Sequence, residues 1–173
     1  MTDMTAHVVE VAVVSCTDPV ARGLAAALEA DIDVRYAEDG GADGGDPVAA
    51  AEWAARPEQV TPPAGVFVVA RLGGVPVGCG AVRPMRGRGA GAGRAEIKRM
   101  YTAPAARRRG VSRAVLARLE DEARALGYHR VHLETGARQP EAIALYEATG
   151  YRRIAPYGQF EDHELTVCFG KDL

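Results

Sequence analysis

The sequence is poor in lysine, aromatic residues and cysteine, and it has no long hydrophobic run. Lysine occurs only at Lys98 and Lys171, so arginine supplies almost all of the positive charge, and 21 basic against 23 acidic residues leave a net charge of −2. A chain so close to neutral has no long-range attraction to nucleic acid or anionic lipid. No stretch approaches the ~20 apolar residues that a membrane-spanning helix needs. We therefore expect neither a nucleic-acid nor a membrane partner, and any bound anion must be held by local groups.

The three cysteines, Cys16, Cys79 and Cys168, are odd in number and far apart. This pattern fits neither a disulfide framework nor a zinc site. We expect small buried hydrophobic residues in a reducing compartment rather than nucleophiles. Residues 1–7 contain Asp3 but no Lys or Arg, so they lack the cationic segment that begins a secretory signal. These features predict a cytoplasmic protein.

The length of 173 residues suits one domain spanning 1–173. Runs of β-branched residues predict strands, and apolar residues at helical spacing predict helices. The expected strands are 8–15, 65–71, 75–83, 95–102, 131–135, 151–155 and 165–169, and the expected helices are 19–30, 47–55, 110–126 and 140–149. Asp18 before Pro19 is typical of a helix start, and the glycine-rich, acidic segment 38–46 should be a surface loop. The fold class is therefore mixed α/β.

The strongest helix signal runs from Gly110 to Leu126, and Gly127 can end it. Its apolar residues recur at helical spacing, as expected for a helix with one buried face. These residues are Val111, Val115, Leu119, Ala123 and Leu126.

A short basic turn, Arg107 to Ser112, connects the strand expected to end at Thr102 to this helix. The first turn of a helix has amides without intrahelical partners and a partial charge of roughly +0.5, so it can hold a phosphate group. Gly110 would let the backbone approach such a ligand closely, and the adjacent arginines can bind phosphate oxygens. The alternative is that the basic run is a solvated face before a helix.

A second glycine- and arginine-rich segment occupies residues 84–94. It is not followed by Lys-Ser or Lys-Thr and does not open a helix, so it lacks the context of phosphate- and dinucleotide-binding loops. We expect it to be a flexible hairpin connection.

The block RRRGVSRAVL at 107–116 resembles the Arg/Gln-x-x-Gly-x-Gly/Ala signature of the GCN5-related N-acetyltransferase superfamily. Three further segments resemble that superfamily in the same order: GVPVGCGAV at 74–82, AEIKRMYTAP at 95–104 and EAIALYEATGY at 141–151. The resemblance is clear over 65–173 and less certain over 8–56. Ser112 stands where the family has Gly or Ala.

This resemblance implies a twisted, mixed and mostly antiparallel sheet, splayed at its centre between the strands near Met100 and Leu133, with helices on both faces. Acetyl-CoA, the implied cosubstrate, would lie in the splay, and its pantetheine arm would pair with strand backbone as an added strand does. The implied cofactor-binding residues are Met100, Tyr101, Thr102, Arg107, Arg108, Arg109, Gly110, Val111, Ser112, Arg113, Gln139 and Tyr146.

Acetyl transfer to an amine requires a base, because a primary amine with a pKa near ~10 is mostly protonated at neutral pH. The resemblance implies Glu96 as this base, acting through a water, with Glu134 as second candidate. Either could instead be a sheet-surface charge, and Lys98 could pair with Glu96 because residues i and i+2 share a face. The thioester oxygen would be stabilised by the backbone N–H of Met100.

Tyr146 matches the tyrosine that the family commonly uses as general acid toward the departing thiolate. The alternative is an aromatic residue packed on an amphipathic helix. Direct attack by the amine, without an acetyl-enzyme, follows from the resemblance and from the lack of a convincing cysteine nucleophile. Metal is not expected, because His129, His132 and His163 are not spaced as metal ligands.

The acceptor is expected to be a small-molecule primary amine, in a pocket framed by the N-terminal helices and the loops 83–94 and 155–162. The two acids of the 155–162 loop, Glu161 and Asp162, would favour a cationic amine, together with Glu38 and Asp39 if the loop 38–46 folds inward. The alternative is that these are solvated loop acids, which are common. The alternatives are acetylation of a protein N-terminus or lysine, a non-catalytic acyl-CoA-binding sensor, and, least favoured, a nucleic-acid-binding domain. The sequence leaves a homodimer open.

Overall fold

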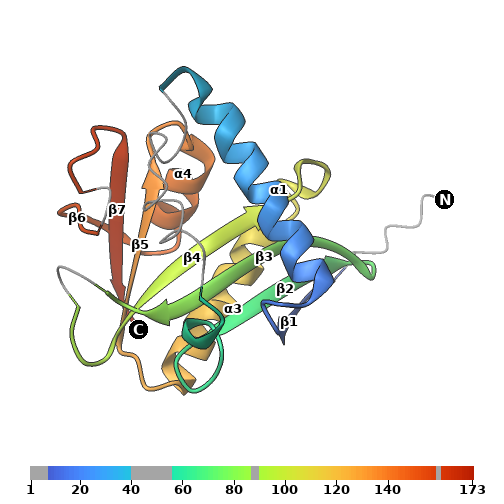
Figure 1. Ribbon diagram of the computed structural model, residues 1–173, viewed down its shortest axis with the longest axis horizontal. Coiled ribbons are helices and arrows are strands. Elements are labelled where there is room, and N and C mark those ends of the chain that lie inside the picture. The colour runs from blue at the N-terminus through green and yellow to red at the C-terminus, as the bar shows by residue number, and fades with distance from the viewer. Residues whose placement is uncertain (1–7, 40–55, 87–89, 159–160) are drawn as a thin grey trace.

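The computed structural model describes residues 8–39, 56–86, 90–158 and 161–173 (Figure 1). The strands are β1 (Val9–Val14), β2 (Val66–Leu72), β3 (Val75–Pro84), β4 (Arg94–Thr102), β5 (Arg130–Gly136), β6 (Arg152–Ile154) and β7 (Thr166–Asp172). The longer helices are α1 (Pro19–Tyr36), α3 (Val111–Ala125) and α4 (Pro140–Ala148). The helix predicted over 47–55 and most of the loop predicted over 38–46 lie outside the described residues.

The seven strands form one sheet in the order β1-β2-β3-β4-β5-β7-β6. Every neighbouring pair is antiparallel except β4 and β5, which run parallel. The mixed, mostly antiparallel sheet predicted from the sequence is therefore confirmed.

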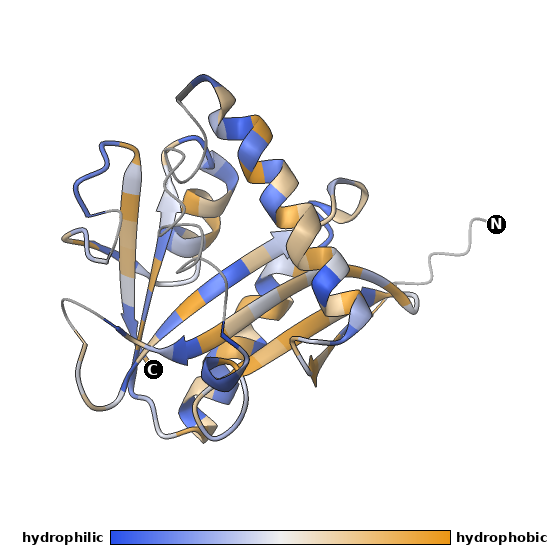
Figure 2. Ribbon diagram, viewed as in Figure 1, coloured by the Kyte–Doolittle hydropathy of each residue, from blue (hydrophilic) through white to orange (hydrophobic). Residues whose placement is uncertain are grey.

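Helices cover both faces of the sheet, as predicted: α1 crosses one face and α3 lies against the other (Figure 1). Side chains alternate between the two faces of a strand, so Val66 and Val68 of β2 pack with α3, while Phe67 and Val69 pack on the α1 side. Burial on both faces explains why residues 66–70 of this strand are a continuous apolar run, which stands out in Figure 2. Within the described ranges, none of the helices has the length and apolar character to span a bilayer.

Helix α3 has the predicted stripe: Val111, Val115, Leu119 and Ala123 are all buried against the sheet. The helix begins after Gly110, whose φ of 81° lies in the left-handed region that glycine adopts without strain. Gly127 follows the helix with a φ of 86°, which confirms the predicted stop.

Helix α1 starts as predicted, because the Asp18 side chain accepts hydrogen bonds from the amides of Val20 and Ala21. The predicted end near residue 30 is wrong, since the helix continues to Tyr36. Its buried apolar residues recur every four positions through the acidic segment: Leu24, Leu28, Ile32 and Tyr36. Burial of this stripe extends the helix from residue 30 to Tyr36, because tertiary packing outweighs the weaker propensity of the intervening residues.

The parallel pairing of β4 with β5 is short, running from Arg94 opposite Arg130 to Ile97 opposite Leu133. A bulge then places Arg99 and Met100 opposite a single residue of β3, and Arg99 has a φ of 61°. Bulges bend a strand and increase its twist, so β4 diverges while β5 continues along β7 as far as Gly136. The predicted splay is therefore confirmed, and it is visible between β4 and β5 in Figure 1.

Candidate active site

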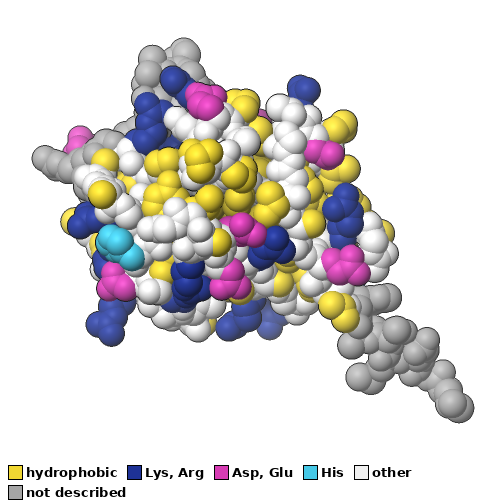
Figure 3. Space-filling model, turned by 90° about the horizontal axis from the view of Figure 1, so that it is seen from below, with side chains coloured by type: hydrophobic (Ala, Val, Ile, Leu, Met, Phe, Trp, Pro, Cys, Tyr) yellow, Lys and Arg dark blue, Asp and Glu magenta, His cyan; other side chains and the backbone are white. Residues whose placement is uncertain are grey.

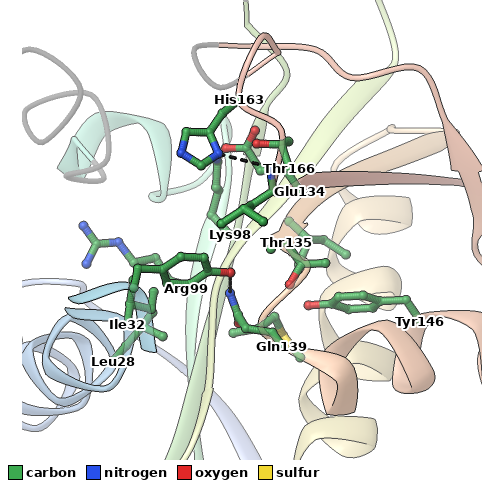
Figure 4. Close-up of a pocket in the computed structure, with 15 residues that line it drawn as sticks. Leu28, Ile32, Lys98, Arg99, Glu134, Thr135, Gln139, Tyr146, His163 and Thr166 are labelled. Carbon is green, nitrogen blue, oxygen red and sulfur yellow. Dashed lines mark hydrogen bonds and ion pairs between the residues drawn. The ribbon is translucent and has the colours of Figure 1, made fainter. Parts of the chain in front are cut away.

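A pocket lies in the splay, between the diverging strands and under α1 (Figure 4). Five elements contribute to its lining. The lining residues are Leu28, Ile32 and Tyr36 of α1, Ile97 to Met100 of β4, Glu134 to Gly136 of β5, Gln139 and Tyr146 at α4, and His163, Leu165 and Thr166 near β7.

The diverging part of β4 offers backbone groups toward the splay. Residues 98–102 continue past the last pair with β5, so on that side they have no strand neighbour among the described residues. An extended ligand segment can bind such an edge. The Thr102 hydroxyl at the end of this edge is buried and has no hydrogen-bond partner within the described ranges. Met100, Tyr101 and Thr102, all predicted cofactor contacts, therefore lie along one edge that fits an extended polar chain.

The predicted diphosphate segment forms the connection from β4 to α3. Arg108 and Arg109 are exposed, Gly110 provides the turn, and no side chain caps the first amides of α3. A Cβ atom on Gly110 would have no neighbouring atom within 4 Å, so the helix start faces open space. Ser112 is half-buried and Arg113 exposed on this first turn, whereas Val111 packs in the core. Uncapped amides, a positive helix end and adjacent arginines together fit a diphosphate group.

Arg107 differs from its exposed neighbours, because its guanidinium turns toward α1. Its Nη2 donates to Asp31 at 3.0 Å and its Nε donates to the carbonyl of Thr102 at 3.3 Å. Asp31 also accepts a hydrogen bond from Arg35 at 2.9 Å, and Arg35 forms an ion pair of 2.5 Å with Glu141 of α4. This charged chain joins the basic turn to the opposite arm of the splay.

Gln139 lies at the start of α4, where its side-chain amide donates to the Tyr36 hydroxyl at 3.5 Å. That hydroxyl occupies the space above Gly136, since a Cβ atom there would come within 1.5 Å of it. The end of α1 thus lies directly on the β5 arm, and Gln139 borders the pocket between them.

Tyr146 lies on α4 and is 4% exposed. Its ring packs against the rings of Tyr151 and Phe169, with centroids 5.7 Å apart in both cases. Its hydroxyl nevertheless points into the pocket, toward Thr135 and Gln139 (Figure 4). Burial raises the pKa of Tyr146 above its ordinary value, so the phenol is protonated at neutral pH and can donate a proton. The sequence suggested two alternatives for Tyr146, a packed aromatic residue or a general acid. The structure is compatible with both at once, because the ring is packed and the hydroxyl faces the pocket.

Glu96 is 4% exposed and both of its carboxylate oxygens are bonded. Arg83 donates to Oε2 at 3.0 Å and Lys98 lies 3.3 Å from Oε1, while the Tyr157 hydroxyl donates to Oε1 at 3.2 Å. The pairing of Lys98 with Glu96 that the strand spacing suggested is confirmed. Glu96 is not among the residues that line the pocket.

Glu134 is the first residue of β5 beyond the parallel pairing, and it does line the pocket. Its Oε1 forms an ion pair with Lys98, and its side chain is 7% exposed. Its Oε2 is buried without a hydrogen-bond partner among the described residues. Buried acceptors without partners are uncommon in proteins, so this oxygen is a candidate acceptor for a ligand donor.

The predicted acceptor loops contribute less than expected. Glu161 and Asp162 do not line the pocket, and neither do Glu38 and Asp39, whereas the neighbouring His163 and Leu165 do. Phe160 and the middle of the 84–94 loop lie outside the described residues. Among the residues that the structure describes, no group of three or more His, Cys, Asp or Glu side chains could hold a metal ion.

Sequence reasoning missed Arg99, Asp31 and the apolar face of α1. Arg99 is buried and forms an ion pair of 2.8 Å with Glu29 of α1. Only the bulge in β4 brings it beneath that helix, so no local pattern marks it. The stripe of α1 could have been found, because Leu24, Leu28, Ile32 and Tyr36 recur at helical spacing beyond the predicted end.

The three cysteines are free thiols. Cys79 and Cys168 are buried as predicted, whereas Cys16 is only half-buried. Burial raises the pKa of Cys79 to about 12 and the pKa of Cys168 to about 11. Neither is a thiolate at neutral pH.

On the face seen in Figure 3, basic and acidic side chains are interspersed around a hydrophobic centre, and this face has no large area of a single charge sign.

The sequence profile of the Acetyltransferase (GNAT) family matches residues 31–151. An IAA acetyltransferase of Azospirillum brasilense is 41% identical over 107 residues, which are 62% of this chain and 67% of that protein. The uncharacterized N-acetyltransferase YjgM of Escherichia coli is 35% identical over 92 residues, 53% of this chain and 54% of that protein. The chain thus matches between about half and two thirds of these relatives' lengths.

Solved structures share the whole fold. A Klebsiella pneumoniae protein described as an acyl-CoA N-acyltransferase has a TM-score of 0.72 and 28% identity, with 95% of this chain and 97% of that chain covered. The PaiA N-acetyltransferase of Thermoplasma acidophilum, solved in complex with coenzyme A, has a TM-score of 0.67 and 14% identity. The alignment covers 96% of this chain and 99% of that chain, and at this identity it shows a likeness of fold. With the family profile matching well over half of its length, the chain belongs to the acetyltransferase (GNAT) family.

Proposed function

We propose that this protein transfers the acetyl group of acetyl-CoA directly to a primary amine of a small-molecule acceptor. The observation that carries the proposal is the splay itself: one pocket joins the free edge of β4, the protonated Tyr146 and the partly unsatisfied Glu134. An enzyme of this kind needs a place for an extended thioester arm, an acid and a base within one enclosure.

Backbone groups are suited to hold the cosubstrate. In the proposal, the edge of β4 at Met100, Tyr101 and Thr102 binds the pantetheine arm, and the first turn of α3 binds the diphosphate. The Met100 N–H stabilises the thioester oxygen as it gains charge; losing one such donor in other enzymes costs about 2.7–4 kcal/mol. Coenzyme A or acetyl-CoA in fold relatives from Thermoplasma acidophilum and Salmonella typhimurium supports this choice of cosubstrate.

The base assignment differs from the first sequence hypothesis. Glu96 is engaged by Arg83, Lys98 and Tyr157 and does not line the pocket, so the geometry supports it as the group that positions Lys98. Glu134 lines the pocket, and its Oε2 is buried without a hydrogen-bond partner among the described residues. We assign the removal of the amine proton to Glu134.

The proposed reaction balances with one proton released. Glu134 takes a proton from the acceptor ammonium, and the nitrogen lone pair attacks the thioester carbonyl carbon. The new C–N bond forms as the C–S bond breaks, and the departing thiolate takes a proton from the Tyr146 hydroxyl. Return of the Glu134 proton to Tyr146 and loss of the second amine proton to solvent restore the enzyme. The products are an N-acetylamine, coenzyme A and one proton.

Steady-state release of coenzyme A thiol, measured with purified protein, acetyl-CoA and a panel of amines, tests the proposal. Tyr146→Phe should lower kcat by about 10²–10⁴-fold, the usual contribution of a general acid, with the Kd for acetyl-CoA little changed. Tyr151→Phe is the matched control, because it removes a buried hydroxyl that bonds Glu120 on the far side of the same aromatic cluster. It should lower stability and leave kcat near wild type.

Two results would contradict the proposal. Turnover by Tyr146→Phe at the wild-type rate would remove the acid role. Binding of acetyl-CoA without thiol release above the blank, for every amine tested, would favour a sensor of the cosubstrate instead.

A further inference from the structure

The geometry points to the acceptor class: a primary amine whose substituent is an apolar alkyl or aryl group, with the ammonium bound by Glu134 and the substituent bound by the stripe Leu28, Ile32 and Tyr36 of α1. This inference rests on the proposed acetyl transfer and narrows it. In this inference Glu134 recognises the amine in place of the loop acids suggested by the sequence, since Glu38, Asp39, Glu161 and Asp162 do not line the pocket.

On the polar side of the pocket, the carboxylates of Glu96 and Glu134 are paired with cations. Of their four oxygens, only Glu134 Oε2 has no partner among the described residues. Lys98 is shared by Glu96 and Glu134, and the second Glu96 oxygen is bonded to Arg83. These are two cations and two anions, all with side chains no more than 12% exposed, so their charges cancel. Arg99, the other cation of the pocket, is paired with Glu29.

Glu134 Oε2 is the oxygen left over. It is buried, its side chain is more than nine-tenths buried, and no donor reaches it in the part of the chain that the structure describes. An unsatisfied buried acceptor costs about 1–3 kcal/mol. A ligand N–H is the partner that this oxygen lacks, whereas a ligand carboxylate would face a carboxylate. The site therefore selects a donor at this position.

The opposite wall is apolar. Leu28, Ile32 and Tyr36 are spaced four residues apart, so they form one face of α1, and each is 6% exposed. Leu165 packs against the same three residues from the segment before β7. A substituent lying on this wall would bury apolar surface, while a second charge there would lose its hydration without a partner. Diamines, acidic amino acids and extended peptides are disfavoured for this reason.

Thiol-release assays with matched amines test this selection. 2-Phenylethylamine carries an apolar ring, putrescine carries a second ammonium, and glutamate and a short peptide with a free N-terminus represent the other classes. We expect kcat/KM for 2-phenylethylamine to exceed the values for the other three by at least about tenfold, since lost contacts in an apolar pocket cost about 10–200-fold.

Two variants separate the two halves of the site. Glu134→Gln keeps the size but removes the charge, so kcat/KM for 2-phenylethylamine should fall by about 10²-fold or more while the Kd for acetyl-CoA stays near wild type. Ile32→Asp places a carboxylate on the apolar wall and should raise the ratio of kcat/KM for putrescine over 2-phenylethylamine by at least about tenfold. Val34→Asp is the control, because it makes the same change on the same helix at a side chain that is 80% exposed.

A changed preference cannot come from a misfolded variant, so the Ile32→Asp result is informative even if its total activity is low. Wild-type preference for putrescine, glutamate or the peptide would overturn the inference and leave the proposed acetyl transfer intact. An unchanged preference in Ile32→Asp, or wild-type kcat/KM in Glu134→Gln, would also overturn it. Absence of thiol release with every amine would overturn the proposed function and this inference together.

Discussion

Replacement of Asp31 by asparagine should raise the affinity of the protein for coenzyme A. Asp31 holds the guanidinium of Arg107 at 3.0 Å, and Arg107 is the first residue of the basic turn that we propose as the diphosphate site. A bound diphosphate would compete with Asp31 for this guanidinium. The neutral amide keeps the size of the side chain and removes the charge that competes.

The magnitude follows from the exposure of the pair. The side chains of Arg107 and Asp31 are 36% and 29% exposed, so water screens their attraction. Ion pairs of this kind contribute about 0.2–1 kcal/mol. Because about 1.4 kcal/mol corresponds to a tenfold change in Kd, we expect the Kd for coenzyme A to fall by about 1.4- to 5-fold.

Isothermal titration calorimetry with coenzyme A would measure this effect at low ionic strength. Asp33→Asn is the matched control, because Asp33 is exposed on the same helix and forms no ion pair within the described ranges. The difference between the two variants should shrink as salt is added, since screening weakens exposed pairs. A Kd for Asp31→Asn equal to or higher than that of Asp33→Asn would refute competition between Asp31 and the diphosphate.

Two further predictions concern stability. Gly110→Ala should lower the free energy of unfolding by about 1–2 kcal/mol, because only glycine adopts its φ of 81° without strain. The control is Gly23→Ala inside α1, where a Cβ atom also meets nothing within 4 Å; it should raise the free energy of unfolding by about 0.5–1 kcal/mol. Equal thermal midpoints for the two variants would contradict this prediction. Burial lowers the pKa of His132, and the charges of Arg130 and Arg94 lower it further. Below the unfolded-state pKa of about 6.5, the unfolded chain therefore binds a proton that the folded chain does not bind. The free energy of unfolding should decrease as the pH is lowered through this range, by at most about 1.4 kcal/mol per pH unit. In urea unfolding at pH 7.5 and 5.5, His132→Gln should lose less stability than wild type, and equal losses would show that His132 is not responsible.

The proposed cofactor half of the site could be located in the sequence because it is local. A strand, a basic turn with a glycine and an amphipathic helix follow one another over residues 95–125, and each has its own pattern. Backbone amides do most of the proposed binding, so the argument needed no distant contact. The turn geometry, the α3 stripe and the positive φ at Gly110 all agree with that local prediction.

The proposed acceptor half could not be located in the same way. Its residues come from α1, β4, β5 and the segment before β7, and the chain brings them together only by folding. The sequence could not distinguish Glu96 from Glu134, since both are acids on strands near the splay. The two carboxylates differ in their partners: both oxygens of Glu96 are bonded, because Arg83 and Tyr157 reach them, whereas one oxygen of Glu134 has no partner among the described residues.

The extent of α1 illustrates the same limit. Local propensity favoured an end near residue 30, and the helix instead reaches Tyr36 because its stripe is buried over the splay. That extension places Asp31 beside Arg107 and the Tyr36 hydroxyl above Gly136.

The sequence by itself determined the fold class and the strand–turn–helix segment that we propose for the diphosphate, because hydrophobic periodicity and glycine placement act over a few neighbouring residues. The family followed from the resemblance of four segments. Only the tertiary structure decided which carboxylate lines the pocket, which arginines pair with acids of α1 and which apolar residues form the proposed acceptor wall. Those outcomes depend on a bulge that turns β4 away from β5 and on ion pairs between segments far apart in the chain, and no local pattern encodes such contacts.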